Sequence, residues 1–439
     1  MYYSLSHSAF LKMKNKYFLI LCTFLSLYID ESCSMALMGT TTRGASPSLN
    51  LPTAEADRAL RYAASLENAG MPRTAHALYH ESATLYQCLL DSSEFSHVSE
   101  LEFQDDSSKK AYSSKESTLK SYLTYACMRL GYLSHDALSD PRAALRLYKE
   151  ATNISSQPPA EAFDGVGICI EASGGSLKEA VAAYKKSLAI QDNGMVWFHL
   201  AVALERIGEA EEAEEIMENL RRAEAKYACL VDSWGYIRFH TRRTPNEDLN
   251  LYLGTRDMLK IGIEAAMDLV LNQNGLLCEF GVATGRSMRI IQEFIPLDTK
   301  LHGFDTFTGL PLPWNDLPVG SFSTNGNIPN VDGEVYFHRG LFRDSIPRFL
   351  ETSTNEFQPL AFVNIDVLMY SSTLDILEGM HSRVVAGTVF VFADYTSHPT
   401  WRQDEFRAWR EACKRFGWRY EYLGFSLATK QAVVRVTSA

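Results

Sequence analysis

The sequence predicts an α/β domain built on a seven-stranded sheet, preceded by an all-α domain of helical repeats. Three observations lead to this fold class. The chain has 439 residues, which is more than one ordinary hydrophobic core accommodates. From about residue 54 to residue 230, apolar residues recur at helical spacing with almost no strand signals. After residue 250, short strand patterns alternate with helical ones, as in a doubly wound sheet.

The first 38 residues differ in composition from the rest. Three lysines precede an apolar run from Tyr17 to Ile29, and small residues follow it. This order is typical of a secretory signal peptide, and it also fits a signal anchor or an organelle-targeting leader. The run is shorter than the ~20 residues of a membrane span. We expect a signal peptide or signal anchor over residues 1–38, a linker over residues 39–53, and a protein of the secretory pathway or an organelle that is otherwise soluble.

Charge and cysteine content exclude some partners. The formal net charge is −11, and no long basic run offsets it, which argues against binding of nucleic acid. The eight cysteines lie far apart, without a CxxC pair or a His/Cys cluster at zinc spacing. Buried free thiols are therefore the expectation.

Within the helical half, a small residue is repeatedly followed four positions later by a large one. The pairs are Ala75 and Tyr79, Ala144 and Tyr148, Ala180 and Tyr184, and Ala213 and Met217. The last three alanines are 36 and 33 residues apart, a period typical of tetratricopeptide repeats. We predict the array over residues 54–230, with a loop insertion at about residues 91–118. Such arrays bind peptides, mediate dimerisation or shield a site, so a protein partner is one expectation here.

The α/β half is predicted to cover residues 231–439. Its expected strands are 276–280, 300–305, 335–339, 360–366, 388–392, 419–425 and 432–436, and its expected helices are 255–271, 286–294, 374–384 and 401–416. Glu279, Asp305, Asp366 and Asp394 all fall at strand ends. Because parallel strands end at the same edge of a sheet, these four acids should converge on one rim.

A loop with two glycines follows the first of these strands. It runs from Glu279 through Gly281 and Gly285 to Ser287, where a helix begins. The glycines permit positive φ and close approach of the main chain, and a helix start offers free N–H groups to an anionic ligand. A dinucleotide fingerprint requires three glycines in the order G-x-G-x-x-G. The spacing here favours S-adenosylmethionine, with Asp305 placed to hold the ribose hydroxyls.

With these residues placed, the C-terminal half resembles the macrocin O-methyltransferase (TylF-like) family, whose members methylate sugar hydroxyls of natural products. The matching runs are Glu279–Gly285, Gly303–Pro311 with Trp314, Gly340–Pro347, Asn364–Asp366 with Tyr370–Thr373, and Phe392–Tyr395 with Trp401. The resemblance implies a Rossmann-like class I methyltransferase domain. It further implies that Glu279, Gly281, Gly285 and Ser287 cradle the methionine part of the donor while Asp305 holds the ribose.

The chain departs from the family at two acidic positions. The family's metal-binding aspartate corresponds to Asp366, but its general-base position is Leu368. After the next strand the family has two acids, whereas this chain has Ala393 and Asp394. The resemblance thus implies that Asp366 and Asp394 hold Mg²⁺, and it leaves the catalytic base unassigned. A histidine, namely His302, His338 or His398, is an alternative base.

Two functions follow as expectations. The first is an S-adenosylmethionine-dependent O-methyltransferase that acts on a small molecule or sugar. The second is a catalytically impaired protein of the same fold, in which the repeats serve as an interaction scaffold. The glycine loop and Asp305 favour the first function, and Leu368 with Ala393 favours the second. Methylation of a sugar hydroxyl requires removal of a proton of high pKa, which leucine cannot accept.

Overall fold

The computed structural model describes residues 51–91, 106–241, 251–352 and 357–439. The leader expected at residues 1–38 and most of the linker after it lie outside the described residues. From Leu51 to Ala439 the chain forms one unit of internal contacts. None of the helices in the described ranges is both long and apolar enough to cross a membrane.

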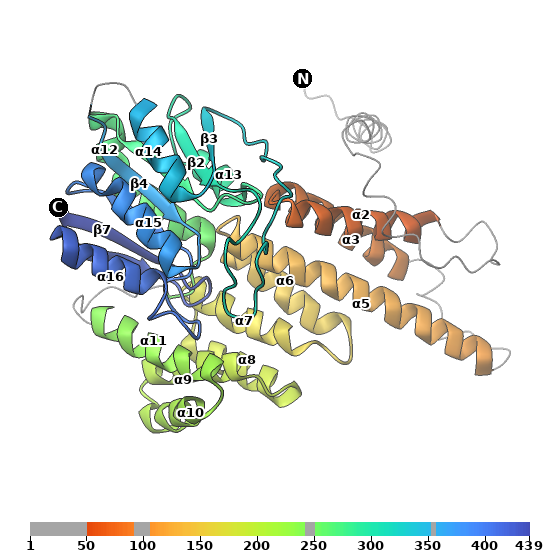
Figure 1. Ribbon diagram of the computed structural model, residues 1–439. Coiled ribbons are helices and arrows are strands. Elements are labelled where there is room, and N and C mark those ends of the chain that lie inside the picture. The colour runs from red at the N-terminus through yellow and green to blue at the C-terminus, as the bar shows by residue number, and fades with distance from the viewer. Residues whose placement is uncertain (1–50, 92–105, 242–250, 353–356) are drawn as a thin grey trace, which may run out of the picture. The chain divides into compact units, whose positions relative to one another are not determined.

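The first part of this unit is all-helical (Figure 1). Its helices are α2 (Leu51–Asn68), α3 (Pro72–Leu90), α5 (Asp106–Asp136), α6 (Pro141–Ile154), α7 (Ala160–Ala172), α8 (Leu177–Ile190), α9 (Gly194–Ile207), α10 (Ala210–Arg222) and α11 (Ala225–Thr241). Consecutive helices pack against each other, as the repeat pattern predicts. The predicted domain boundary at residue 230 falls inside α11, which therefore continues the helical part.

The small and large residues of the predicted repeat lie between the helices. Ala180 and Tyr184 are fully buried, and the Tyr184 ring fills the space above Gly167. The Tyr148 ring likewise lies against both Gly131 and Gly165. Small residues thus admit an aromatic ring from the neighbouring helix, which confirms the packing expected of the repeat.

The loop insertion predicted for residues 91–118 is wrong in its second half, because α5 begins at Asp106 and continues without interruption to Asp136. Its N-terminal sequence is rich in polar residues, and these continue the helix because propagation costs little once a helix exists. An ion pair from Lys120 to Glu116, four residues apart, supports this turn at 2.6 Å.

The second part of the unit contains a seven-stranded sheet of order β3-β2-β1-β4-β5-β7-β6. The strands are β1 (Leu276–Phe280), β2 (Leu301–Asp305), β3 (Val335–Arg339), β4 (Leu360–Ile365), β5 (Val389–Phe392), β6 (Arg419–Phe425) and β7 (Ala432–Ser438). The first five run parallel, and β7 is antiparallel to both of its neighbours. All seven predicted strands are present, and the order reverses between β1 and β4, where ligands bind in such sheets.

Helices cover both faces of the sheet. They are α12 (Thr255–Gln273), α13 (Arg286–Gln292), α14 (Phe342–Thr352), α15 (Tyr370–Met380), the 3-10 turn η2 (His381–Arg383) and α16 (Glu405–Phe416). Residues of α12 and α13 share one apolar core with inward side chains of the strands. Residues of α14, α15 and α16 share a second core, which also includes α7 to α11. The seven-stranded α/β domain preceded by tetratricopeptide-like helices is therefore the observed fold.

Candidate functional site

The glycine loop connects β1 to α13 at the edge where the parallel strands end. Gly281 adopts a φ of +87°, and a Cβ atom on it would lie 1.9 Å from the main-chain oxygen of Asp366. No side chain fits between the two segments. Glycine at this position therefore brings the loop after β1 into direct contact with the segment after β4.

Asp305 holds the same loop from the end of β2. Its Oδ2 accepts a hydrogen bond from the Ala283 N–H at 2.8 Å, and its Oδ1 accepts one from the Phe307 N–H at 2.7 Å. Oδ1 also accepts a long hydrogen bond of 3.5 Å from the Thr306 hydroxyl, so Oδ2 is the oxygen that retains a further lone pair for a ligand hydroxyl. Asp305 thus fixes the shape of the loop and also presents its carboxylate to the cavity beside it.

Glu279 lies beneath the loop and is completely buried. Its Oε1 accepts a hydrogen bond from the Ser287 hydroxyl at 2.5 Å, whereas Oε2 has no hydrogen-bond partner within the described part of the chain. The Asn364 side chain lies near Glu279 and favours the ionised form of its carboxyl group, although no hydrogen bond joins Asn364 to Oε2. Burial, reinforced by the charge of Asp366, raises the pKa of Glu279 to about 8 despite the Ser287 hydrogen bond.

A cavity of about 860 Å³ opens at this edge of the sheet. Its walls come from the glycine loop, the ends of β2, β4 and β5, and the segments 309–312 and 428–431. Of the predicted donor residues, Gly281, Ser287 and Asp305 line it, while Glu279 and Gly285 do not. A volume of this size accommodates a cofactor together with a small acceptor.

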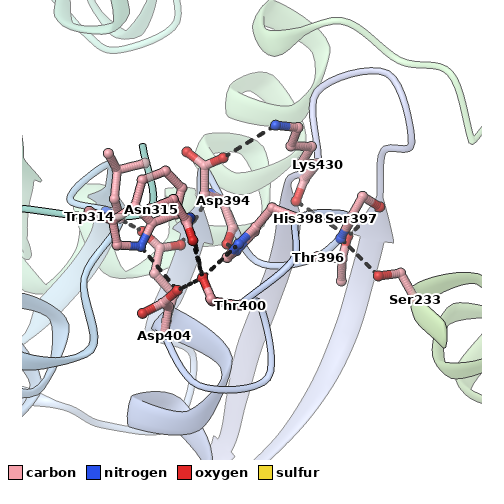
Figure 2. A network of polar contacts seen from close by, with 12 residues as sticks. Ser233, Trp314, Asn315, Asp394, Thr396, Ser397, His398, Thr400, Asp404 and Lys430 are labelled. Atoms are coloured by element: carbon pink, nitrogen blue, oxygen red, sulfur yellow. Dashed lines mark hydrogen bonds and ion pairs between the residues drawn. The ribbon is translucent and has the colours of Figure 1, made fainter. Parts of the chain in front are cut away.

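Two of the predicted acids, Asp366 and Asp394, line the same cavity. The Asp366 side chain is exposed to the cavity, and protein surrounds the cavity at this point. This enclosure, together with the charge of Asp394, raises the pKa of Asp366 to about 7. Burial also raises the pKa of Asp394, against the effect of Lys430, whose Nζ lies 4.0 Å from Oδ1 (Figure 2). All four acids predicted for the rim are therefore at this edge.

A third carboxyl group, that of Glu405, supports these segments from the first turn of α16. Oε1 accepts hydrogen bonds from the N–H groups of Val367 and Leu368 at 3.5 and 3.2 Å, and Oε2 accepts one from Asp394 N–H at 3.2 Å. The side chain is completely buried, and this burial, followed by the charges of Asp394 and Asp366, raises its pKa well above the usual range. Sequence reasoning missed Glu405, and its only sequence signal is an acid in the first turn of an amphipathic helix.

An apolar side chain occupies the position of the family's general base. Leu368 lines the cavity in a left-handed conformation with a φ of +65°, and it packs with Leu310 and Met369. Ala393 lines the cavity as well and offers no polar atom from its side chain.

The three histidines considered as alternative bases do not line the cavity. His302 and His338 contact each other at 3.2 Å between β2 and β3, and burial, followed by the charge of His338, lowers the pKa of His302 to about 4. His398 lies behind Asp394, where its Nε2 hydrogen-bonds to the Asp394 main-chain oxygen at 3.0 Å (Figure 2). These contacts give all three rings packing roles.

The described residues contain no group of three or more His, Cys, Asp or Glu side chains arranged to hold a metal ion. The predicted ligands Asp366 and Asp394 line the cavity, and so do the carboxylates of Asp305 and Asp375. Magnesium usually takes one or two protein carboxylates and completes its shell with water or substrate oxygens. A metal at this position would therefore depend on oxygen atoms that the protein itself does not supply.

Comparisons with known proteins bear on both parts of the chain. Residues 321–415 match the family described as Macrocin-O-methyltransferase (TylF). No curated protein matches the sequence significantly. Similar solved structures include the calicheamicin methyltransferase CalS11, with 21% identity over 52% of this chain and 93% of that one and a TM-score of 0.33. The O-methyltransferase NovP has 22% identity over 42% and 81%, with a TM-score of 0.32.

A further similar structure matches helical repeats. It is YrrB, a TPR protein with an unusual peptide-binding site, at 16% identity over 44% of this chain and 94% of that one, with a TM-score of 0.24. The family match includes Asp366, Leu368 and Asp394, and the glycine loop lies before it. Residues 321–415 of this chain thus match the macrocin-O-methyltransferase (TylF) family, which confirms the resemblance that the sequence motifs indicate.

Proposed function

We propose that the protein is an S-adenosylmethionine-dependent O-methyltransferase that acts on a hydroxyl of a small molecule or sugar. One observation carries this proposal. The cavity at the strand ends combines a glycine loop that admits no side chain at Gly281, the carboxylate of Asp305, which can accept a hydrogen bond from a ribose hydroxyl, and the acids Asp366 and Asp394. The family match over residues 321–415 supports it.

Each part of the cavity has a distinct role in this proposal. The donor, when bound, supplies the methyl group from its sulfonium. Gly281 and Ser287 border the methionine part, and a positively charged group there would favour ionisation of the buried Glu279 carboxyl behind Ser287. Asp305 Oδ2 has a lone pair left for a ribose hydroxyl. The segment 309–312, together with Phe322, closes the remaining side, where an acceptor would lie.

Removal of the acceptor proton falls to the remaining carboxylates, because Leu368 cannot accept it. Asp366 faces the cavity and has a pKa of about 7, which suits a general base near neutral pH. Asp394 lies in the same wall and is within reach of Lys430. In this proposal the two acids either take the proton directly or hold Mg²⁺ together with substrate oxygens.

The experiment is calorimetric titration of S-adenosylhomocysteine into the full-length protein, with and without Mg²⁺. We expect micromolar binding, since the donor half of the cavity is complete. Loss of binding in Asp305→Ala, with retention in the surface variant Glu264→Ala, would locate it in the cavity. No binding to the unchanged protein would contradict the proposed function. If Asp366 and Asp394 hold Mg²⁺, S-adenosylhomocysteine should bind more tightly with Mg²⁺, or methyl transfer should occur only with Mg²⁺. Binding and methyl transfer that a chelator leaves unchanged would refute a role for the metal.

The second candidate is a catalytically impaired protein that keeps the fold and uses its repeats as an interaction scaffold. Leu368 and Ala393, two apolar side chains in the cavity wall, favour it. The double variant Leu368→Asp with Ala393→Asp restores the family's acids. If loss of the base limits the protein, methyl transfer to a hydroxyl acceptor should appear or rise by at least about 100-fold. An unchanged rate would show that loss of the base is not what limits the protein.

A further inference from the structure

The turn between α2 and α3 lies directly on the glycine loop. Gly70 has a φ of +70°, and a Cβ atom on it would lie 2.5 Å from the Thr284 Oγ1 and 3.1 Å from the Arg286 Cβ. Arg289 of α13 joins the two segments, since its Nη1 donates to the Gly70 oxygen at 3.1 Å and to the Thr284 oxygen at 2.8 Å. A helical-repeat turn is thereby in van der Waals contact with a loop that lines the cavity.

The C-terminal end of α5 makes a second contact with the same wall. Asp136 is buried, and its Oδ1 accepts hydrogen bonds from both the N–H and the hydroxyl of Thr255 at 2.9 and 2.8 Å. Its Oδ2 pairs with Arg286. Burial opposes ionisation of Asp136, but Arg286 and the Thr255 hydrogen bonds outweigh it and lower its pKa. Thr255 and Arg286 both line the cavity, so a charged group of the repeats holds two cavity residues.

A third contact fixes the far end of α13. Glu293, which follows this helix, accepts two hydrogen bonds of 2.7 Å from Arg73 of α3 and is also paired with Arg256 of α12 at 2.9 Å. Helix α13 is short, with residues 286–292, and the glycine loop leads directly into it. The repeats therefore hold both ends of the element that presents the loop.

We propose that the helical repeats are a structural part of the donor site, and that Gly70 and Asp136 are positioning residues for the glycine loop and Arg286. This inference rests on the proposed function. A loop with positive φ at Gly281, Ala283 and Gly285 depends on its surroundings for its shape. Without Asp136, Arg286 would lose its buried counter-charge, and without the α2–α3 turn, Thr284 would lose its packing.

The test uses two matched glycine variants of the full-length protein. Gly70 and Gly174 both follow a repeat helix with nearly the same φ, +70° and +69°, but a Cβ atom on Gly174 would meet nothing within 4 Å. Gly70→Ala and Gly174→Ala therefore carry the same backbone strain, and only the first also displaces the glycine loop. The measured quantities are the Kd for S-adenosylhomocysteine and the thermal midpoint.

We expect Gly70→Ala to weaken binding by about tenfold, within the usual range of coupling between sites, while Gly174→Ala leaves it unchanged. Adding Thr284→Ala to Gly70→Ala removes the closest clash, so the double variant should lose less affinity than the two single changes combined. Equal Kd values for the two glycine variants would overturn the inference.

A second variant tests the same inference if the Gly70→Ala protein does not fold. Asp136→Asn keeps an acceptor for Thr255 and removes the charge that faces Arg286. We expect it also to weaken binding several-fold, and unchanged affinity in a folded Asp136→Asn protein would contradict the role of Asp136. Absence of binding in the unchanged protein has a different meaning, because it refutes the proposed function and the inference together.

Discussion

Glu279 is the residue with the clearest pH signature. Its pKa is about 8 in the folded chain, against ~4.3 for an unfolded glutamate. Between these values the folded state binds the extra proton, so the free energy of unfolding falls as pH rises. The contribution is fully present below the unfolded pKa and is lost as pH passes through 8.

We therefore expect Glu279→Gln to flatten this decline. The difference in the free energy of unfolding between the variant and the unchanged protein should be about 3 kcal/mol larger, in favour of the variant, at pH 8 than at pH 5. Denaturant unfolding at both pH values measures it. The surface variant Glu264→Gln is the control, since its side chain is 63% exposed. Equal pH slopes for the unchanged protein and Glu279→Gln would show that Glu279 ionises normally.

The residues of the site were predictable to different extents. Acids at strand ends and glycines in a strand-to-helix turn are local patterns, and all of these residues lie at the expected edge of the sheet. Glu405, Arg286 and Lys430 could not be assigned in this way. Each acts through a partner distant in sequence, such as Asp136 for Arg286, and no local spacing encodes that pairing.

Among the secondary-structure elements, α16 holds two neighbouring segments in place through a side chain in its first turn. Glu405 there receives the N–H groups of Val367, Leu368 and Asp394, two of which follow β4 and one β5. Leu368 also has a positive φ, which an unsupported leucine avoids. The Glu405 carboxyl group thereby accepts the N–H groups of both the segment after β4 and the segment after β5, which do not bond to each other.

We expect Glu405→Ala to lower the free energy of unfolding by about 3 kcal/mol, because three buried N–H groups lose their acceptor. Glu405→Gln keeps one acceptor oxygen and should cost about 1 kcal/mol. Chemical denaturation at pH 7 measures both losses. Similar losses for the two variants would contradict this expectation, because Glu405→Gln keeps the side-chain volume and one acceptor oxygen.

Helices and strands whose apolar residues recur with a regular spacing are predictable from the sequence. Elements that also contain residues typical of loops are not. Strands β1, β4 and β5 are fully buried apolar runs, whereas the edge strands β3 and β6 are only partly buried. All seven appear where the pattern puts them. Helix α14 was not predicted, since it contains Pro347, which the structure accommodates inside the helix. Serines and acids at the start of α5 resemble a solvated insertion, so the sequence pattern predicts a loop where the chain is helical.

Across the whole unit, one apolar core joins the repeats to the sheet domain. Trp234 and Ile237 of α11 belong to the same cluster as Trp401 and Phe392 of the α/β part. The Ser397 N–H also donates to the Ser233 hydroxyl at 2.8 Å, and Arg402 pairs with Asp232 (Figure 2 shows Ser233 and Ser397). These contacts make independent unfolding of the two parts unfavourable.

We therefore expect residues 51–439 to unfold in a single calorimetric transition. Asp136→Asn should lower the midpoint of that one transition by several degrees, since a buried ion pair loses one charge. The exposed pair of Arg435 and Glu421 provides a control, and Glu421→Gln should shift the midpoint far less. Two separate transitions, only one of them sensitive to Asp136→Asn, would contradict a shared core.

The contact between Gly70 and Thr284 also constrains how this chain can change over generations. A larger residue at position 70 meets the Thr284 side chain at once, so it is tolerated only after position 284 becomes smaller. The two positions should consequently vary together among descendants, although 214 residues separate them in the sequence. Recombination that exchanges the repeat array for an unrelated one would break this match, which favours inheritance of both parts as a single gene segment.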